Sequence, residues 1–302
     1  MFDQNIFARI AEWQSQGKKT GLAKLVGVDG SSPRPIGAQI AVAEGGAHCG
    51  VISSGCAEEA IIAAALQAVT DGTTHITRYG KDSPFLDIEL PCGSGLDILF
   101  SGTGVDTLTT AVTALHAQRR TAFVSMADDL SLSIADTATP EAMAYPPDYH
   151  LHVFGAGPHF TCFAELAHSL GYRLFAHSTD SAALAHLASL GIGGHSMTHK
   201  TAFSPQSFDT HSAVITLFHE HNLEVPILQA ALNSEAHFIG ALGSRKTHAQ
   251  RLNMLDMQGP FARPTSDVFG PVGLDIGAAD PAEIALSIMA QIVAHRRKGG
   301  TA

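Results

Sequence analysis

The sequence predicts an α/β protein of two domains, an N-terminal α+β domain over residues 1–147 and a C-terminal Rossmann-like, doubly wound parallel sheet over residues 148–302. The second half alternates apolar, strand-like segments with helical ones, and repeated βα units imply parallel strands with helices on both faces. The first half has short strand-like segments with one or two helices. The pair Pro146-Pro147 ends a stretch without regular patterning, which indicates a domain boundary.

In the first half, strands are expected over 21–28 and 38–43. The turn-rich segment between them contains Pro33 and Pro35, which stiffen the chain and hold the Arg34 guanidinium outward. The other elements expected here are a helix after Cys56, two β-like segments flanking PCGSG, a helix from about Asp106 to Arg119 and a strand over 121–127.

In the second half the alternation is regular, with no short internal repeat. The expected strands are 151–157, 173–177, 213–218 and 237–242, and the expected helices are 160–171, 182–191, 224–233, 244–259 and 281–297.

The four cysteines are Cys49, Cys56, Cys92 and Cys162, and the first three are expected in glycine-rich loops. Cys56 directly follows Ser-Ser-Gly at the start of an alanine-rich helix, where unpaired N–H groups and the helix dipole favour a thiolate. From the residues alone, catalysis, metal binding and packing all remain open for this thiol. The cysteines are expected to be reduced, because no secretory signal precedes them.

The formal charge of −10 makes a nucleic-acid or acidic-membrane surface improbable. No stretch approaches the roughly 20 apolar residues of a membrane span, and the amphipathic, acid-containing start is unlike a signal peptide, so a cytoplasmic protein is expected. Seventeen histidines raise the question of a metal site. They are scattered, however, and the close pairs His195/His199 and His219/His221 are interpreted as solvated or core residues.

The segment VFGAGPHF places Gly155 and Gly157 at the first two positions of a dinucleotide-binding fingerprint, on a strand-to-helix turn. Phe160 occupies the third glycine position, where its ring is expected to push the helix away from the sheet. His177 stands where an acid would bind a ribose hydroxyl, and Asp180 could serve only if the loop curls back. Weak NAD(P) binding is therefore expected, with another phosphate-bearing ligand or a structural turn as the alternatives.

Two more loops of the second half are candidate ligand sites. In FIGALGSRKTH a strand is followed by a helix that begins with Arg245 and Lys246, which suggests an anion site at the carboxyl edge of the sheet, although solvated charges would give the same pattern. The segment GPVGLDIGAADPAEI combines two glycines with Asp275, and glycine packing alone is the alternative reading.

The arrangement of these motifs resembles the XdhC/CoxI family, accessory factors of molybdenum-cofactor enzymes such as xanthine dehydrogenase. The segments that carry the resemblance are GSSPRPIGAQIAV, GVISSGCAEE, LPCGSGLDI, VFGAGPH, FIGALGSRKTHAQRL and GPVGLDIGAADPAEIALSIMAQIVA. They follow the family's order and span most of the chain. SSGC replaces the usual Gly-Gly-Cys, and AHSTD replaces an acid-rich strand end.

The resemblance implies an N-terminal XdhC-type domain with cysteine motifs and a C-terminal Rossmann domain. It implies a chaperone that binds molybdenum cofactor, supports its sulfuration and inserts it into a xanthine-dehydrogenase-type apo-enzyme, with no turnover of its own. A cysteine desulfurase and a second copy of the chain are further candidate partners. The implied cofactor-binding residues are Arg34, Gly37, Cys56, Glu58, Cys92, Gly155, Gly157, Arg245 and Asp275, with Cys56 and Cys92 near molybdenum.

The alternative function is that of a nucleotide-dependent oxidoreductase using the C-terminal domain. The missing third glycine and the displaced acid argue against it. A scaffold with an empty Rossmann domain is a third possibility.

Overall fold

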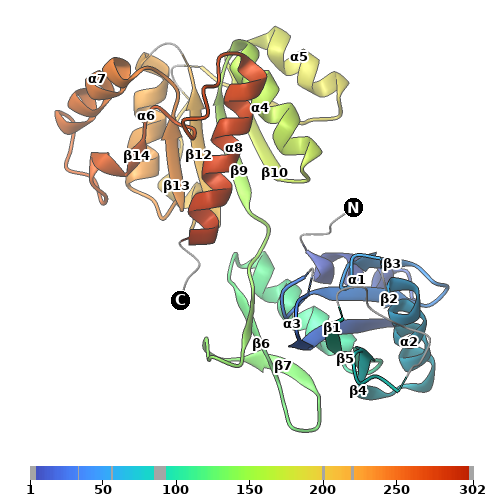
Figure 1. The fold of residues 1–302 in the computed structure, drawn as a ribbon. Helices are drawn as coiled ribbons and strands as arrows, with labels where there is room; N and C mark the ends of the chain where they lie inside the picture. Colours follow the sequence, from blue (N-terminus) through green and yellow to red (C-terminus); the bar gives the residue numbers. More distant parts are fainter. Residues whose placement is uncertain are drawn as a thin grey trace. The chain divides into compact units, whose positions relative to one another are not determined.

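The computed structural model describes residues 5–32, 34–55, 57–84, 93–198, 201–218 and 221–298. The chain divides into two compact units, Met1–Pro147 and Asp148–Ala302. Both units combine helices with sheets, and the second contains a parallel sheet, so the predicted fold class is confirmed (Figure 1).

The first unit is built on a five-stranded antiparallel sheet of order β3-β2-β1-β5-β4. Its strands are β1 (Thr20–Asp29), β2 (Gln39–Ala43), β3 (His48–Gly50), β4 (Thr74–Gly80) and β5 (Gly95–Ser101). Cys49 lies on β3 and pairs with Ala41, so the expectation that it sits in a loop is wrong. The strand is only three residues long, too short for its alternation to be recognised.

Helices cover both faces of this sheet. The helix α2 (Glu58–Asp71) packs on one face against Ala23, Leu25 and Phe100. The helices α1 (Ile6–Ser15) and α3 (Val105–Ala117) share the opposite core with Leu22. Alternation along β1 therefore sends successive side chains into two separate cores.

A second, three-stranded sheet of order β7-β6-β8 completes this unit, with β6 (Ala122–Met126), β7 (Leu132–Ala135) and β8 (Met143–Tyr145). The sequence pattern predicted neither β7 nor β8, and β8 lies in the stretch without regular patterning that contains Pro146 and Pro147. Both strands are short, and they gain their hydrogen bonds by pairing with β6 on both sides.

Three connections of the first unit leave its large sheet at the same edge. Asp29 ends β1 and pairs with Gly95, which begins β5 and also pairs with Gly80 at the end of β4. Gly50 ends β3 opposite Ile40 near the start of β2. The antiparallel register therefore places at one end of the sheet the strand ends from which the connections β1–β2, β3–α2 and β4–β5 depart. In the sequence, these connections contain Arg34, Cys56 and Cys92.

The second unit contains a six-stranded parallel sheet of order β11-β10-β9-β12-β13-β14 (Figure 1). Its strands are β9 (His150–Gly155), β10 (Arg173–Ser178), β11 (Gly194–Ser196), β12 (Ser212–Leu217), β13 (Phe238–Ala241) and β14 (Val268–Phe269). The strands β11 and β14 at the two edges are too short for the sequence pattern to reveal.

Two apolar cores lie on opposite faces of the parallel sheet. On one face, α4 (Gly157–Ser169), α5 (Ser181–Ser189) and α8 (Pro281–Lys298) pack over Leu151 and Val153. On the other, α6 (His221–Leu232) and α7 (Arg245–Asp256) pack over Val214 and Ile239. This is the doubly wound arrangement that the alternating pattern predicts. Within the described residues, no helix combines the length and apolarity needed to cross a membrane.

Candidate functional site

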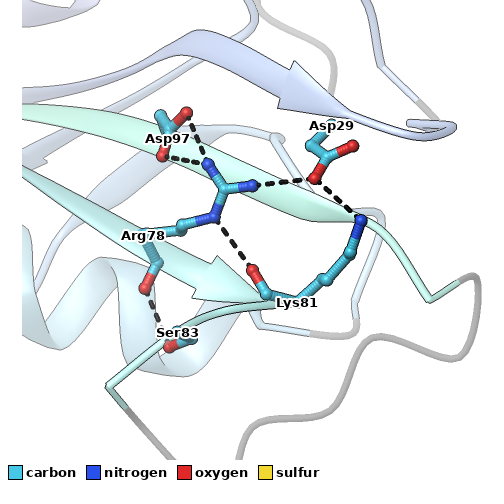
Figure 2. A network of polar contacts seen from close by, with 5 residues as sticks. All are labelled: Asp29, Arg78, Lys81, Ser83 and Asp97. Atoms are coloured by element: carbon cyan, nitrogen blue, oxygen red, sulfur yellow. Dashed lines mark hydrogen bonds and ion pairs between the residues drawn. The ribbon is translucent and has the colours of Figure 1, made fainter.

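An ion-pair network joins the strands from which two of the three N-terminal connections depart (Figure 2). Arg78 donates from Nη1 to both carboxylate oxygens of Asp97 at 3.1 Å and from Nη2 to Asp29 at 3.1 Å. Lys81 adds a second cation 3.2 Å from Asp29, and its carbonyl accepts from Arg78 Nε at 2.9 Å. Gly95 provides the space, because a Cβ there would lie 2.5 Å from Arg78 Nη2.

The network fixes the geometry at the base of these connections more than it adds stability, since partly exposed pairs contribute at most about 1 kcal/mol each. Sequence reasoning missed it. The three strands are far apart in the chain, and only their register brings the four side chains together.

Glu58 holds the connection that leads from β3 to α2. Its carboxylate accepts N–H bonds from Ile52 at 2.7 Å, Ser53 at 2.9 Å and Gly55 at 2.8 Å, together with the Ser53 hydroxyl. Burial opposes ionisation, but these hydrogen bonds outweigh it and lower the pKa of Glu58 below its ordinary value. The Glu58 carboxylate therefore accepts hydrogen bonds from three backbone N–H groups of the loop and fixes the conformation of the loop.

Ser54 in this loop adopts a positive φ of 58°, a conformation that favours glycine. The backbone therefore explains why the related motif has a second glycine here and why a small residue still fits. Cys56, the next cysteine along, and Cys92 both lie outside the described residues.

Arg34 and Gly37 line a cavity of about 280 Å³ in the first unit. Gly50 and Val51, which begin the connection toward Glu58, line it as well. Gly37 has a φ of +94°, so a side chain at this position would be strained, and it would also displace the end of the Met143 side chain. Two of the predicted site residues, Arg34 and Gly37, therefore line the same cavity as the first residues of the β3–α2 connection.

In the second unit, Gly155 and Gly157 form the turn from β9 into α4. A Cβ on Gly155 would lie 2.8 Å from the Leu217 Cβ and 3.1 Å from the Phe160 Cβ, so only glycine fits there. Gly157 opens the helix with a φ of +69°. Phe160 is fully buried in the core beside Val153, and the expectation that its ring displaces the helix is wrong, because the apolar core accepts the ring and Gly155 leaves room for its Cβ.

The end of β10 presents an imidazole where a dinucleotide-binding domain places an acid. His177 stacks on Phe154, with ring centroids 4.8 Å apart, and on His195 at 5.2 Å. Burial, and then the neighbouring His195, lower the pKa of His177 to about 4. Asp180 is engaged in capping α5, accepting from the N–H groups of Ala182 and Ala183.

Arg245 begins α7 directly after β13 and is exposed to solvent. Ser244 caps this helix by accepting from the Thr247 N–H at 3.1 Å. Lys246 is also exposed, so two exposed cations stand at the first turn of the helix.

A buried ion pair supports the turn that carries Arg245. Arg251 is fully buried and donates to Glu224 at 2.8 Å and to the Leu242 carbonyl at 2.5 Å. His248 lies 3.1 Å from Arg251 Nη1 and can accept from it through Nδ1. The sequence did not predict this pair. Arg251 lies in a polar helix, where an arginine is expected to be exposed, and Glu224 is 27 residues away.

The loop that contains Asp275 is attached to α8 through Gly273. The φ of Gly273 is +116°, a Cβ would meet the Ser287 hydroxyl, and its N–H donates to the Gln291 side chain at 2.7 Å. Leu274 N–H donates to the Ser287 carbonyl at 3.2 Å. Asp275 itself is exposed beyond this anchor.

The parallel sheet brings the C-terminal candidates to one edge. Gly155 ends β9 and Gly157 follows it, Arg245 follows β13, and Asp275 follows β14, so all lie beyond carboxyl strand ends, where open α/β sheets bind ligands. Arg34, Gly37 and Glu58 belong to the other unit. In the part of the chain that the structure describes, no three His, Cys, Asp or Glu side chains gather as a metal site.

Comparisons with known proteins agree with both halves of this description. The model of the XdhC and CoxI family matches residues 13–80, and that of the XdhC Rossmann domain matches residues 151–292. The chain is 33% identical over 287 residues to the molybdenum cofactor insertion chaperone PaoD of Escherichia coli K12, covering 93% of this chain and 84% of PaoD.

A second relative, from Bacillus subtilis, is described as a probable subunit of xanthine dehydrogenase and is 26% identical over 92% of this chain and 93% of its own length. The crystal structure of a xanthine dehydrogenase from Bacillus halodurans shares the fold, with a TM-score of 0.76 at 19% identity over 98% of this chain and 97% of that one. With cysteine-motif connections on one unit and a Rossmann-type sheet in the other, the chain belongs to the XdhC and CoxI family.

Proposed function

We propose that the protein is an accessory chaperone that binds molybdenum cofactor, supports its sulfuration and inserts it into a xanthine-dehydrogenase-type molybdoenzyme in the cytoplasm. The observation that carries this proposal is the 33% identity to PaoD, a molybdenum cofactor insertion chaperone, across 93% of the chain and therefore across both units. The cofactor is the cargo of the protein, and its client enzyme uses it.

Each unit contributes its own set of proposed cofactor-binding residues. In the first unit, Cys56 and Cys92 would lie near molybdenum and its exchangeable sulfur, with Arg34 and Gly37 at the adjoining cavity and Glu58 shaping the loop. In the second unit, Gly155, Gly157, Arg245 and Asp275 are the proposed cofactor-binding residues, at the carboxyl ends of the parallel strands. A cysteine desulfurase would donate the sulfur, and a second copy of the chain is a candidate partner.

A nucleotide-dependent oxidoreductase finds less support. His177 stacks between two aromatic rings where a ribose-binding acid would stand, and Asp180 caps α5. NAD and NADP are therefore expected to bind weakly.

The test in cells examines the client enzyme. Deleting the gene should leave a client of normal size and flavin content that lacks molybdenum or its terminal sulfur and no longer hydroxylates purines. The reason is that a carrier acts on its client only through the molybdenum centre, whereas polypeptide and flavin are assembled by other routes. A plasmid-borne copy of the gene should restore the molybdenum, the terminal sulfur and the purine hydroxylation of the client. A client with full molybdenum, full sulfur and normal activity in the deletion strain would refute the proposal.

A further inference from the structure

A buried lysine lies near a tyrosine that lines the cavity of the first unit. Lys24 on β1 is 6% exposed, and its Nζ lies 5.9 Å from the centroid of the Tyr145 ring, which lines the cavity. Within the described part of the chain, no carboxylate or other hydrogen-bond partner reaches its ammonium group. Burial lowers the pKa of Lys24, as expected for an ammonium group held away from water and acids.

The Tyr145 hydroxyl is positioned to donate to a ligand. It accepts a hydrogen bond from Gln39 Nε2, which leaves its own proton available. Burial raises the pKa of Tyr145, so the hydroxyl stays protonated at physiological pH. The hydroxyl therefore offers a donor at the wall of the cavity.

His116 links the strand β8 to the start of α1 through both of its ring nitrogens. Its Nε2 donates to the Tyr145 carbonyl at 3.0 Å, because a carbonyl can only accept. Its Nδ1 then accepts from the Asn5 amide at 3.4 Å. The imidazole therefore fixes the Tyr145 backbone and the start of α1 relative to each other.

The lining of the cavity combines hydrogen-bond donors with an apolar wall. Arg34, Gln39, Tyr145 and the first turn of α1 supply donors, and none of the described lining residues is acidic. The apolar part consists of the side chains of Ile6, Phe7, Val51, Met143 and Pro146. The volume of about 280 Å³ is at the lower end of the range for small-molecule sites.

We propose that this cavity binds the oxyanion of a small organic phosphate, with Arg34 and the Tyr145 hydroxyl contacting its oxygens, Lys24 supplying positive potential from behind the Tyr145 ring, and the apolar wall holding the organic body. A negative ligand offsets the cost of burying an ammonium group without a carboxylate partner. The inference rests on the proposed function in that Arg34 and Gly37 are assigned there to the cofactor. Free phosphate shares the oxyanion chemistry, but it would leave the apolar wall uncovered.

Titration of the full-length protein with inorganic phosphate and with phenyl phosphate, at constant ionic strength, tests the proposal by calorimetry. Phenyl phosphate should bind at least tenfold more tightly than inorganic phosphate, because burying a phenyl ring contributes about 1.4 kcal/mol or more. Arg34→Gln should weaken binding of phenyl phosphate about 10- to 100-fold, and Lys24→Met about tenfold. Lys19→Gln removes an equal charge from an exposed position outside the cavity and should leave binding unchanged.

Tyr145→Phe keeps the ring, removes the donor hydroxyl and should weaken binding of phenyl phosphate. It therefore tests the site even if the charge variants fail to fold. The proposal is overturned if neither probe binds at millimolar concentration, if Lys19→Gln weakens binding as much as Arg34→Gln, or if Tyr145→Phe leaves binding unchanged. Tighter binding of inorganic phosphate than of phenyl phosphate would identify a site for the free ion and would also overturn it.

The two proposals fail in different ways. If the client loses molybdenum in the deletion strain while Arg34→Gln binds phenyl phosphate normally, the cavity assignment is wrong and the carrier function stands. If Arg34→Gln loses phenyl phosphate while the deletion strain makes a fully loaded client, the anion site stands and the carrier function is wrong.

Discussion

Replacing His177 with phenylalanine should make the second unit less sensitive to acid. His177 is packed between Phe154 and His195, and a phenyl ring can preserve this stacking without a titrating nitrogen. The folded-state pKa is about 4, below the ordinary 6.5, so the unfolded chain binds more protons between these two values. Stability from this group is therefore complete above about pH 6.5 and is lost as the pH falls toward 4.

The size of the effect follows from the same two pKa values. Linkage gives a loss of at most about 0.8 kcal/mol at pH 6 and about 2 kcal/mol at pH 5 relative to alkaline pH. Because part of the imidazole reaches solvent, screening reduces this, and we expect about 1 kcal/mol at pH 5. His177→Phe should therefore recover about 1 kcal/mol at pH 5 and change little at pH 8.

Urea unfolding followed by far-UV circular dichroism at about pH 8, 6 and 5 measures these free energies of unfolding. The fluorescence of Trp13, the single tryptophan, follows the first unit and should be unaffected by the substitution. His168→Gln, on the exposed side of α4, is the matched control and should keep the wild-type pH dependence. An equal loss of stability at pH 5 in wild type and His177→Phe would refute the reasoning.

Further predictions concern single contacts of the two units. Arg251→Met should destabilise the second unit by about 3–5 kcal/mol, because it removes the cation from a fully buried ion pair with Glu224; a loss below about 1 kcal/mol in urea unfolding would contradict this. Glu58→Gln should speed amide hydrogen exchange over residues 52–55, whereas Glu59→Gln, on the exposed side of the same turn, should not; equal exchange in both variants would show that the carboxylate does not hold the loop. Calorimetry with NAD and NADP should show no low-micromolar binding, and a dissociation constant near 1 μM, about −8 kcal/mol, would revive the oxidoreductase hypothesis.

The alternating pattern of the second half predicted the doubly wound sheet because strands such as β12 are continuous apolar segments and helices such as α8 are long. The pattern could not reveal β11 and β14, with three and two residues, because such strands exist only through pairing with a neighbour. The turn at Gly155 was recognised from its glycines, but the effect of Phe160 was misjudged, since the depth of the core around a ring depends on tertiary packing.

In the candidate sites too, the residues that shape the backbone locally could be recognised from the sequence, whereas their partners from distant segments could not. Glycine and proline spacing drew attention to the loop of Arg34 and Gly37, because these residues shape the backbone locally. Two residues of the proposed site could not be predicted: Tyr145 on β8, which lines the cavity, and Lys24 on β1, which lies near the Tyr145 ring. They come from distant segments, and β8 is a strand that the pattern did not show. Likewise, only the folded loop shows that the Glu58 carboxylate turns inward.

The central claim, that the protein carries molybdenum cofactor, is tested most directly by what it retains when purified. Full-length protein should be isolated from cells that make the cofactor but lack the client enzyme, with molybdenum measured by mass spectrometry and pterin by fluorescence after oxidation. The account predicts that molybdenum and pterin co-purify in equal amounts with the wild type and with Lys19→Gln, and are depleted in Arg34→Gln. Folded wild-type protein without molybdenum or pterin above the background of an unrelated purified protein would contradict it.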